Sequence, residues 1–217
     1  MSSGFALLWS GGKDSALALD RARRAGLDVQ TLVTFYDSGT ERVRFHATRI
    51  ELIRTQAAAT GVPRLLDLGT AWPEMEVRLV EVLARLRAEG CPGVVLGDIH
   101  LADVRAWYEA RVTAAGLEHV EPLWGEPPAG LLQEFVRTGG RAVVTCVDLE
   151  RLDESWLGRV VDAGFARDIS RLQVDPCGEN GEYHTFAYAG PVFARPVAWT
   201  PGSRRREGRF LQLDLAS

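Results

Sequence analysis

The sequence predicts an α/β protein whose core is a doubly wound, mainly parallel sheet. Two observations carry this prediction. Short apolar runs alternate with amphipathic segments through much of the 217-residue chain, and glycine, often with proline close behind, ends the amphipathic segments. Such alternation is typical of parallel strands joined by right-handed crossovers, with helices on both faces. The alternation breaks down after about residue 150, so we expect one domain over residues 1–150 and a smaller region over 151–217 packed on it.

The expected strands are the short apolar runs, taken in chain order. They are Phe5–Trp9, Val29–Tyr36, Pro63–Leu68, Gly93–Gly97, Leu117–Leu123 and Arg141–Val147. Apolar residues at helical spacing predict helices between them, near 15–25, 46–60, 73–89, 101–115 and 129–138. Farther on, Val192–Thr200 and Phe210–Leu215 alternate around residues 201–206, which contain three arginines. We expect these two runs to pair as an antiparallel hairpin with a basic tip.

The composition restricts the classes of function. The hydrophobic content of 46% allows a substantial core, and no stretch approaches the roughly 20 apolar residues of a membrane span. The formal net charge of -4 argues against a protein that coats nucleic acid. The arginines of the expected tip either contact a polyanion or stay solvated. The three cysteines are far apart, and the start lacks the features of a signal peptide. Both observations favour a reducing cytoplasm.

The segment Ser10-Gly11-Gly12-Lys13-Asp14-Ser15 directly follows the first strand and holds the only lysine of the chain. Its two glycines let the backbone approach a ligand closely, and a helix begins there, so amide groups and the positive end of the helix dipole converge. We therefore predict a phosphate loop, different in spacing from the Walker pattern, with Lys13 as an exposed cation. Asp14 either caps the helix or holds a metal cation. The alternative is a flexible turn before a capped helix.

Ligands of parallel α/β sheets bind beyond the carboxyl ends of the strands. Three loops fall at that edge, namely Ser10–Ser15, Thr34–Thr40 and Gly97–His100. We expect them to meet at one site.

Two later segments are richer in polar groups than folding requires, Leu152–Arg159 and Cys177–Phe186. In the second, Glu179 and Glu182 lie three residues apart among glycines. They could hold an ammonium ion, bind Mg²⁺ or act as a base, or they could be solvated side chains of a turn. The four histidines lack metal-ligand spacing, which argues against a zinc site. Of these, His46 faces either the nucleotide or water, and His184 is the better functional candidate.

These segments resemble a known family. Ser10–Ser15 resembles the PP-loop of the N-type ATP pyrophosphatases, whose fold is that of the adenine nucleotide alpha hydrolases. Glu121–Gly125, Leu152–Arg159 and Gly178–Phe186, followed by Gly190–Phe193, are similar to the diphthine–ammonia ligase family. The stretch from Gly97 to Arg111 looks more like its bacterial members.

The resemblance implies an ATP-dependent, AMP-forming ligase. Such an enzyme adenylates a carboxylate, releases pyrophosphate and lets ammonia displace AMP. The implied partners are ATP, Mg²⁺, a carboxylate-bearing small molecule or protein, and ammonia that is free or comes from a separate donor protein. A homodimer is left open. Two other functions also stay open: a PP-loop enzyme that thiolates tRNA, and a sensor that binds adenine nucleotide without turnover.

The resemblance also assigns roles to residues. The ATP-binding residues would be Ser10, Gly11, Gly12, Lys13, Asp14, Ser15, Val33, Thr34, His46, Gly97 and Asp98. The substrate-binding residues would be Glu154, Trp156, Arg159, Tyr183 and His184. Lys13, Glu179 and Glu182 would be catalytic, and Asp14 would hold Mg²⁺.

Overall fold

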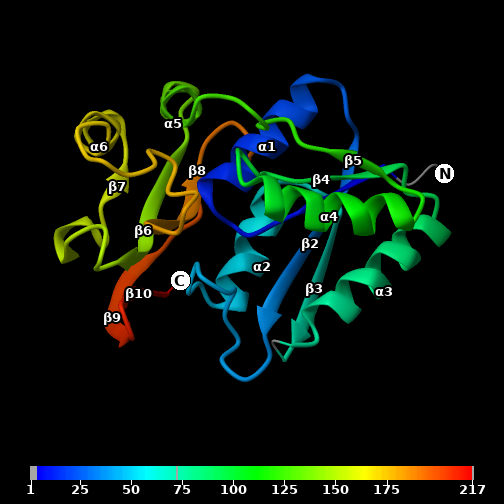
Figure 1. Cartoon of the computed structure of the whole chain (residues 1–217), viewed down its shortest axis with the longest axis horizontal. Coiled ribbons are helices and arrows are strands. Elements are labelled where there is room, and N and C mark those ends of the chain that lie inside the picture. Colours follow the sequence, from blue (N-terminus) through cyan, green and yellow to red (C-terminus); the bar gives the residue numbers. More distant parts are fainter. Residues whose placement is uncertain (1–3, 72, 217) are drawn as a thin grey trace.

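The structure is a computed structural model that describes residues 4–71 and 73–216. Its first half is a five-stranded parallel sheet with the strand order β3-β2-β1-β4-β5 (Figure 1). The strands are β1 (Phe5–Leu8), β2 (Val29–Asp37), β3 (Arg64–Thr70), β4 (Gly93–Val95) and β5 (Glu118–Val120), and the helices between them are α1 (Lys13–Arg24), α2 (Ile50–Ala59), α3 (Met75–Ala88) and α4 (Ala102–Ala114). The strand order reverses between β1 and β4, where ligands of such sheets bind.

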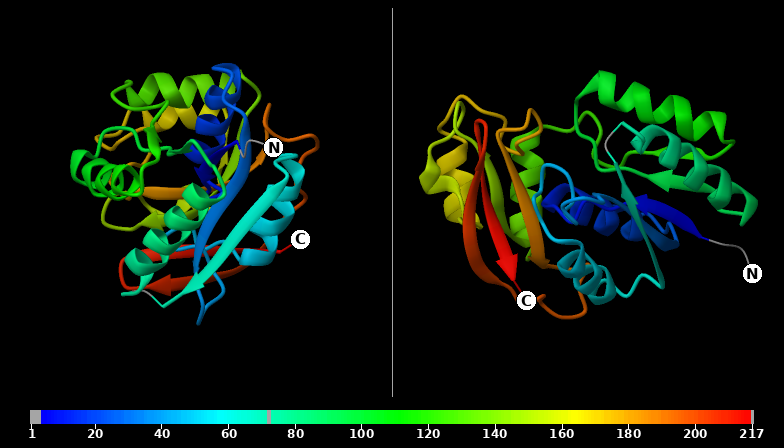
Figure 2. Two further views of the ribbon diagram at one scale, coloured as in Figure 1. Left: turned by 90° about the vertical axis from the view of Figure 1, so that its right-hand side faces the viewer. Right: turned by 90° about the horizontal axis from the view of Figure 1, so that it is seen from below.

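Adjacent residues of the central strand separate the helices into two layers. Leu7 packs in the cluster that contains Leu19 of α1 and Ile53 of α2. Its neighbour Ala6 packs in the cluster that contains Leu83 of α3. Because side chains alternate between the two faces of a strand, α1 and α2 cover one face and α3 covers the other. Figure 2 shows helices on both sides of this sheet, so the doubly wound fold is confirmed.

Glycine ends the helices where the sequence indicated. The helix α2 ends at Ala59, two residues before Gly61, whose φ of 70° is left-handed. No atom would obstruct a side chain at Gly61. The backbone conformation, rather than lack of space, therefore favours glycine there.

A second sheet of five antiparallel strands forms the other half of the molecule. Its order is β7-β6-β10-β9, with β7 paired to the first half of β6 and β10 paired to its last three residues. The strand β8 pairs along most of the length of β6. The strands are β6 (Arg141–Asp148), β7 (Val160–Val161), β8 (Tyr183–Ala189), β9 (Thr200–Glu207) and β10 (Phe210–Ala216). The helices are α5 (Pro128–Arg137), the 3₁₀ turn η1 (Glu154–Trp156) and α6 (Ala163–Ile169).

The expectation that Arg141–Val147 joins the parallel sheet is wrong. This run forms most of β6, whose partners β7, β8 and β10 are all antiparallel to it. Nearly all of β6 is buried, and a fully buried strand has the same continuous apolar pattern in either kind of sheet. The division of the chain at residue 150 stays a prediction, and the two sheets favour a boundary before β6.

The expected hairpin exists, but its position was wrong by several residues. Its first strand is Thr200–Glu207, and the turn falls at Gly208, whose φ is 59°. Arg204–Arg206 therefore lie in the strand instead of at a tip. Pro201 had indicated a turn, but β9 is an edge strand, where proline is tolerated.

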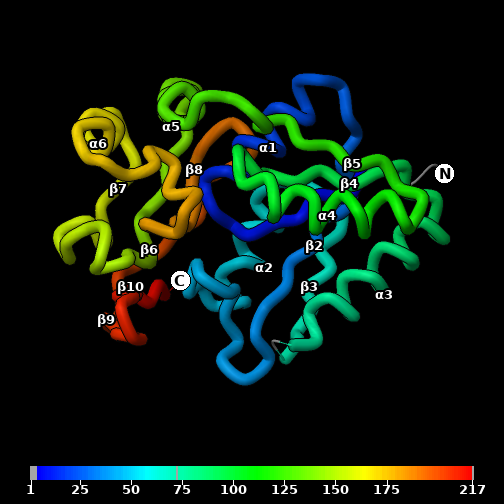
Figure 3. Tube along the Cα trace, viewed as in Figure 1, coloured from blue at the N-terminus to red at the C-terminus, as the bar shows by residue number. Residues whose placement is uncertain are grey.

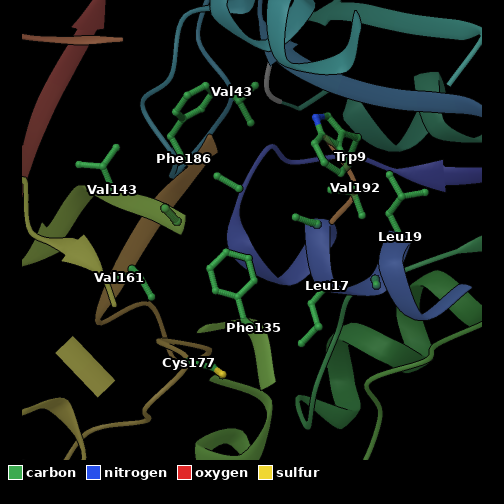
Figure 4. Packing of buried hydrophobic residues seen from close by; sticks show 14 of the residues in the cluster. Trp9, Leu17, Leu19, Val43, Phe135, Val143, Val161, Cys177, Phe186 and Val192 are labelled. Carbon is green, nitrogen blue, oxygen red and sulfur yellow. The ribbon is translucent and has the colours of Figure 1, made fainter. Parts of the chain in front are cut away.

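A continuous core joins the two halves. Leu17 and Leu19 of α1, Phe135 of α5 and Phe186 of β8 belong to one cluster of buried residues (Figure 4). The tube in Figure 3 shows β8 passing next to the beginning of α1, and the Ala187 amide donates a hydrogen bond to the Gly11 carbonyl at 2.9 Å. The second sheet thus reaches directly onto the predicted phosphate loop. No helix in the described part of the chain is long and apolar enough to cross a membrane.

Candidate active site

A cavity of about 330 Å³ lies at the carboxyl ends of β1, β2 and β4, and we call it the first cavity. The loop after β1, the end of β2 and the turn after β4 each contribute residues, so segments from the three expected loops do meet at one edge. Further lining comes from the segment between β2 and α2, from the region around the start of β8, and from α3 and α4. The lining includes Ser10, Lys13, Asp14, Ser15, Val33, Phe35, Phe45, His46, Gly97, Asp98, Tyr108, Glu179, Tyr183, His184 and Thr185.

Glycine is required at both glycine positions of the loop. Gly11 has a left-handed φ of 81°, and a Cβ there would lie 2.4 Å from the Ile53 side chain. A Cβ on Gly12 would lie 2.6 Å from the His46 ring. The amide of Lys13 donates to the Thr185 hydroxyl at 3.1 Å. A contact from β8 therefore fixes the first turn of α1, the helix end that would attract an anion.

Lys13 is buried, with 2% of its surface exposed, so the expectation of an exposed cation is wrong. Its ammonium donates to both carboxylate oxygens of Asp14, at 2.8 and 3.0 Å, and to the Cys177 carbonyl. The Tyr183 ring lies 5.1 Å away. Burial acts to lower the pKa of Lys13, but Asp14, Tyr183 and Cys177 together raise it well above its usual value. The side chain is therefore a charged ammonium, covered by residues more than 160 positions later in the chain.

Two further carboxylates adjoin the Lys13–Asp14 pair. Burial, followed by the charge of Asp14, raises the pKa of Asp98 to about 6. The same causes raise the pKa of Glu179 to about 7, although Glu179 accepts a hydrogen bond from the Ile99 amide at 3.0 Å. A cation among these carboxylates would bring both pKa values back toward their usual range. This side of the first cavity therefore favours a positively charged guest.

The acidic side suits Mg²⁺ only together with a ligand. No three His, Cys, Asp or Glu side chains within residues 4–71 and 73–216 are grouped so as to hold a metal ion by themselves. Magnesium usually takes one or two protein carboxylates and completes its shell with phosphate oxygens and water. Asp14 and Asp98 fit that requirement.

His46 and His184 are both half-buried and uncharged. The Nδ1 atom of His46 donates to the Thr185 carbonyl at 2.9 Å, and burial lowers its pKa. Burial, then the neighbouring His46 and Lys13, lower the pKa of His184 well below its usual value. The His184 ring lies 5.1 Å from the His46 ring and stacks on Phe45 at 5.7 Å. These rings form a neutral part of the cavity wall.

Comparison with known proteins defines the family. A model of the diphthamide synthase N-terminal domain matches residues 3–119, and a model of the diphthamide synthase C-terminal domain matches residues 127–206. The chain belongs to the diphthamide synthase family. Curated relatives named diphthine–ammonia ligase, from Bos taurus and Homo sapiens, are each 26% identical over 88% of this chain and 81% of the relative. The Mus musculus protein of the same name is 25% identical with the same coverage.

Some predicted residues of this diphthamide synthase family member lie away from the first cavity. Arg159 pairs with Asp168 at 2.6 Å and covers the buried ring of Trp156, while the Glu154 side chain is exposed to solvent. All three lie between β6 and β7 and do not line the cavity. Glu182 is also outside it, buried, and accepts from the Asp175 amide at 3.0 Å.

Other predicted residues support the cavity from behind. Gly11 and Gly12 shape the loop without lining the cavity. Thr34 is buried and donates to the Trp9 carbonyl at 2.7 Å, which ties the ends of β1 and β2 together.

Sequence reasoning missed several residues that build the first cavity and the loop beside it. Gln56 is fully buried, accepts from the Trp9 indole at 2.8 Å and donates to the Gly11 carbonyl at 2.8 Å, so it holds the loop. An amide side chain on the apolar face of the expected 46–60 helix was the available signal. Phe45 and Tyr108 also line the cavity, and nothing in the sequence distinguished them from ordinary aromatic residues.

Proposed function

We propose that this chain is an ATP-dependent ligase of the cytoplasm that joins ammonia to a carboxylate-bearing acceptor. One observation supports it above the others: Lys13, at the start of α1, lines the same cavity as Asp98 and Glu179. One side of that cavity suits a polyphosphate, and the other suits a cation or an amine. The name of the relatives, diphthine–ammonia ligase, supports the same class of reaction.

In the first half-reaction, an acceptor carboxylate oxygen would attack the α-phosphorus of ATP. The bond from that phosphorus to the bridging oxygen breaks, and pyrophosphate leaves with the electron pair. The Ser10–Ser15 loop would hold the β- and γ-phosphates, and Lys13 would turn from Asp14 to the leaving pyrophosphate. The middle of β2, at Val33 and Thr34, would hold adenine through backbone groups, with His46 and Gly97 beside the nucleotide. Mg²⁺ held by Asp14 and Asp98 would supply further charge neutralisation.

In the second half-reaction, the ammonia nitrogen would attack the acyl carbon of the adenylate. The bond between that carbon and the phosphate oxygen would break, and AMP would leave with its electron pair. Ammonium must lose protons for this step. Glu179 has a pKa of about 7 because it is buried near Asp14, so near neutral pH it can take up a proton from ammonium. Tyr183 and His184 line the cavity nearby and would bound the space for the acyl group.

The cysteines support a ligase over an enzyme that thiolates tRNA. Burial raises the pKa of the Cys91 thiol, and it raises that of Cys146 to about 12. Burial also raises the pKa of Cys177, although Lys13 counteracts part of this effect. Thiols of this kind are poorly ionised and react slowly, whereas sulfur transfer needs a reactive thiolate.

Phosphorus NMR tests the proposal. ATP, Mg²⁺ and ammonium are incubated with the protein and with cell extract as the source of acceptor. We expect AMP and pyrophosphate, formed only when ammonium and extract are both present, and none with the Lys13→Met variant. ADP and orthophosphate would contradict the mechanism. Binding of ATP with no turnover under any condition would indicate the nucleotide sensor instead.

A further inference from the structure

A second cavity, of about 430 Å³, adjoins the first. The two share part of their walls, including Phe35, Arg44, Phe45 and His184. The far wall of the second cavity comes from the other sheet, with Cys146 of β6 and the facing residues of the β9–β10 hairpin, which are Arg205, Glu207, Phe210 and Gln212. This cavity therefore lies between the two sheets, next to the proposed nucleotide site.

The pairing of β9 with β10 selects one arginine of the basic triplet for the cavity. Arg205 is opposite Gln212, and its guanidinium donates to the Gln212 side chain at 2.6 Å. Side chains alternate along a strand, and neither Arg204 nor Arg206 lines the cavity. Arg206 instead donates to the Gly208 carbonyl at 3.2 Å. The triplet thus directs one guanidinium inward and provides a neighbouring arginine as a natural control.

The charges of the second cavity favour an anion. Three arginines line it, Arg42, Arg44 and Arg205, together with the carboxylates of Asp37 and Glu207, and Arg205 lies 3.5 Å from Glu207. Arg42 also pairs with Asp214, which Arg49 shares, so these four arginines and three carboxylates leave one positive charge in excess. The Asp37 carboxylate accepts hydrogen bonds from two backbone amides of its own turn, at 2.7 and 3.1 Å, and these stabilise its charge locally. The Glu207 side chain is 70% exposed. Aromatic rings supply much of the remaining wall.

The partition between the two cavities is built from strained backbone. Three non-glycine residues between β2 and α2 have left-handed φ values: Glu41 at 54°, Phe45 at 65° and Ala47 at 56°. Such residues cost of order 1 kcal/mol each and occur preferentially at ligand sites. Arg42 anchors the segment by donating to Asp214 of β10 at 2.8 Å and to the Ala47 carbonyl at 2.6 Å. The strained segment holds Phe45 against His184, at the boundary of both cavities.

We propose that the second cavity binds the acceptor, and that the acceptor is a carboxylate carried on an apolar body. The inference rests on the proposed ligase function. It places the acceptor body among the rings of the second cavity, with its reacting carboxylate between Arg205 and the Phe45–His184 wall. Glu154, Trp156 and Arg159 then have no direct role in acceptor binding. A free metabolite and a side chain of a macromolecule could both present such a group.

A titration followed by nitrogen–proton NMR tests the site with phenylacetate as the probe. We expect phenylacetate to shift the amides of Thr40, Cys146 and Gln212, and phenylacetamide, which has the same shape but no charge, to bind much more weakly. Arg205→Gln should weaken phenylacetate binding about three- to tenfold, the effect of losing one partly exposed charged contact. The control Arg206→Gln should bind like the wild type. Added AMP should leave the probe in place, because it would occupy the other cavity.

Equal binding of the acid and the amide, an equal effect of the two arginine variants, or displacement of the probe by AMP would overturn the proposal. So would the absence of any shift at these amides. This titration uses no ATP, whereas the phosphorus NMR experiment does not depend on the second cavity, so the two proposals fail separately. Pyrophosphate release supported by an ultrafiltrate of cell extract would identify a free metabolite, and release supported by the retained fraction would identify a macromolecular acceptor. In either case, release that is insensitive to Arg205→Gln contradicts the assignment.

Discussion

Replacing Lys13 with methionine tests the centre of the site, because methionine keeps the length of the side chain and removes the charge. The ammonium donates to Asp14 and to the Cys177 carbonyl in a place that is 2% exposed. In the variant, that carbonyl loses its donor, and Asp14 faces Asp98 and Glu179 with no cation between them. A hydrogen bond to a charged group contributes about 1.5–3 kcal/mol. We therefore expect urea denaturation to show a free energy of unfolding lower by about 2 kcal/mol.

A double-mutant cycle separates the ion pair from the other contacts of Lys13. Asp14→Asn removes the partner charge, and the double variant should lose less stability than the sum of the two single variants, by about 1–2 kcal/mol. Calorimetry should show ATP affinity of Lys13→Met reduced about 10- to 100-fold, the loss of one charged contact to phosphate. Lys13→Arg should also bind ATP poorly, because the larger guanidinium does not fit between Asp14, Cys177 and Tyr183. Wild-type stability together with wild-type ATP affinity in Lys13→Met would refute the reasoning.

Three further predictions concern the neighbours of Lys13. Glu179→Gln should keep the ATP affinity within a few-fold of the wild type and reduce the rate of amide formation about 100-fold, a loss of about 2.7 kcal/mol of transition-state stabilisation. Glu182→Gln is the control, because Glu182 lies outside the cavity. Equal activity of the two variants would mean that the role of Glu179 is structural. Burial raises the pKa of Asp98 to about 6. Its contribution to stability is therefore full below its unfolded pKa of about 4 and is lost as the pH rises through 6. In Asp98→Asn, the unfolding free energy should fall less between about pH 4 and 7 than it does in the wild type, as measured by urea denaturation across that range. An unchanged slope of unfolding free energy against pH would contradict the raised pKa of Asp98. Thr185→Val removes the hydroxyl that accepts the 3.1 Å hydrogen bond from the Lys13 amide. We expect the free energy of unfolding to fall by about 1 kcal/mol and ATP to bind more weakly. Unchanged ATP binding would show that β8 does not shape the loop.

The sequence predicted the parallel sheet well because each of its elements has a local signal. Apolar runs, helical spacing and glycine stops are all contained within a dozen residues of one another. No local signal predicts which strands pair with β6, because two of its partners, β8 and β10, follow it by 35 or more residues. Pro201 also misled the placement of the hairpin, because an edge strand tolerates a residue that usually marks a turn.

The residues of the candidate site were predictable only where a local sequence signal marks them. The loop Ser10–Ser15 could be predicted to bind phosphate because glycines, a lysine and a helix start are adjacent in sequence. Glu179 was selected because glycines surround it, and the structure places it in the lining of the first cavity. The burial of Lys13 could not be predicted from the local sequence, because Cys177 and Tyr183, which cover it, lie more than 160 residues later in the chain. The resemblance assigned substrate binding to Trp156 and Arg159, but Arg159 lies over the Trp156 ring and pairs with Asp168 of α6, away from the first cavity.

The crossing of β8 over the predicted phosphate loop has a consequence for the order of events during synthesis. The ribosome produces the loop within the first 15 residues, yet the Thr185 and Ala187 contacts that fix it emerge only when most of the chain has been made. A nascent chain with a finished parallel sheet therefore still lacks a finished first cavity. A ligand bound in that cavity would then report that β8 has docked on the loop. Since a ligand stabilises only the state that binds it, such a ligand would favour the fully assembled molecule over a half-built one.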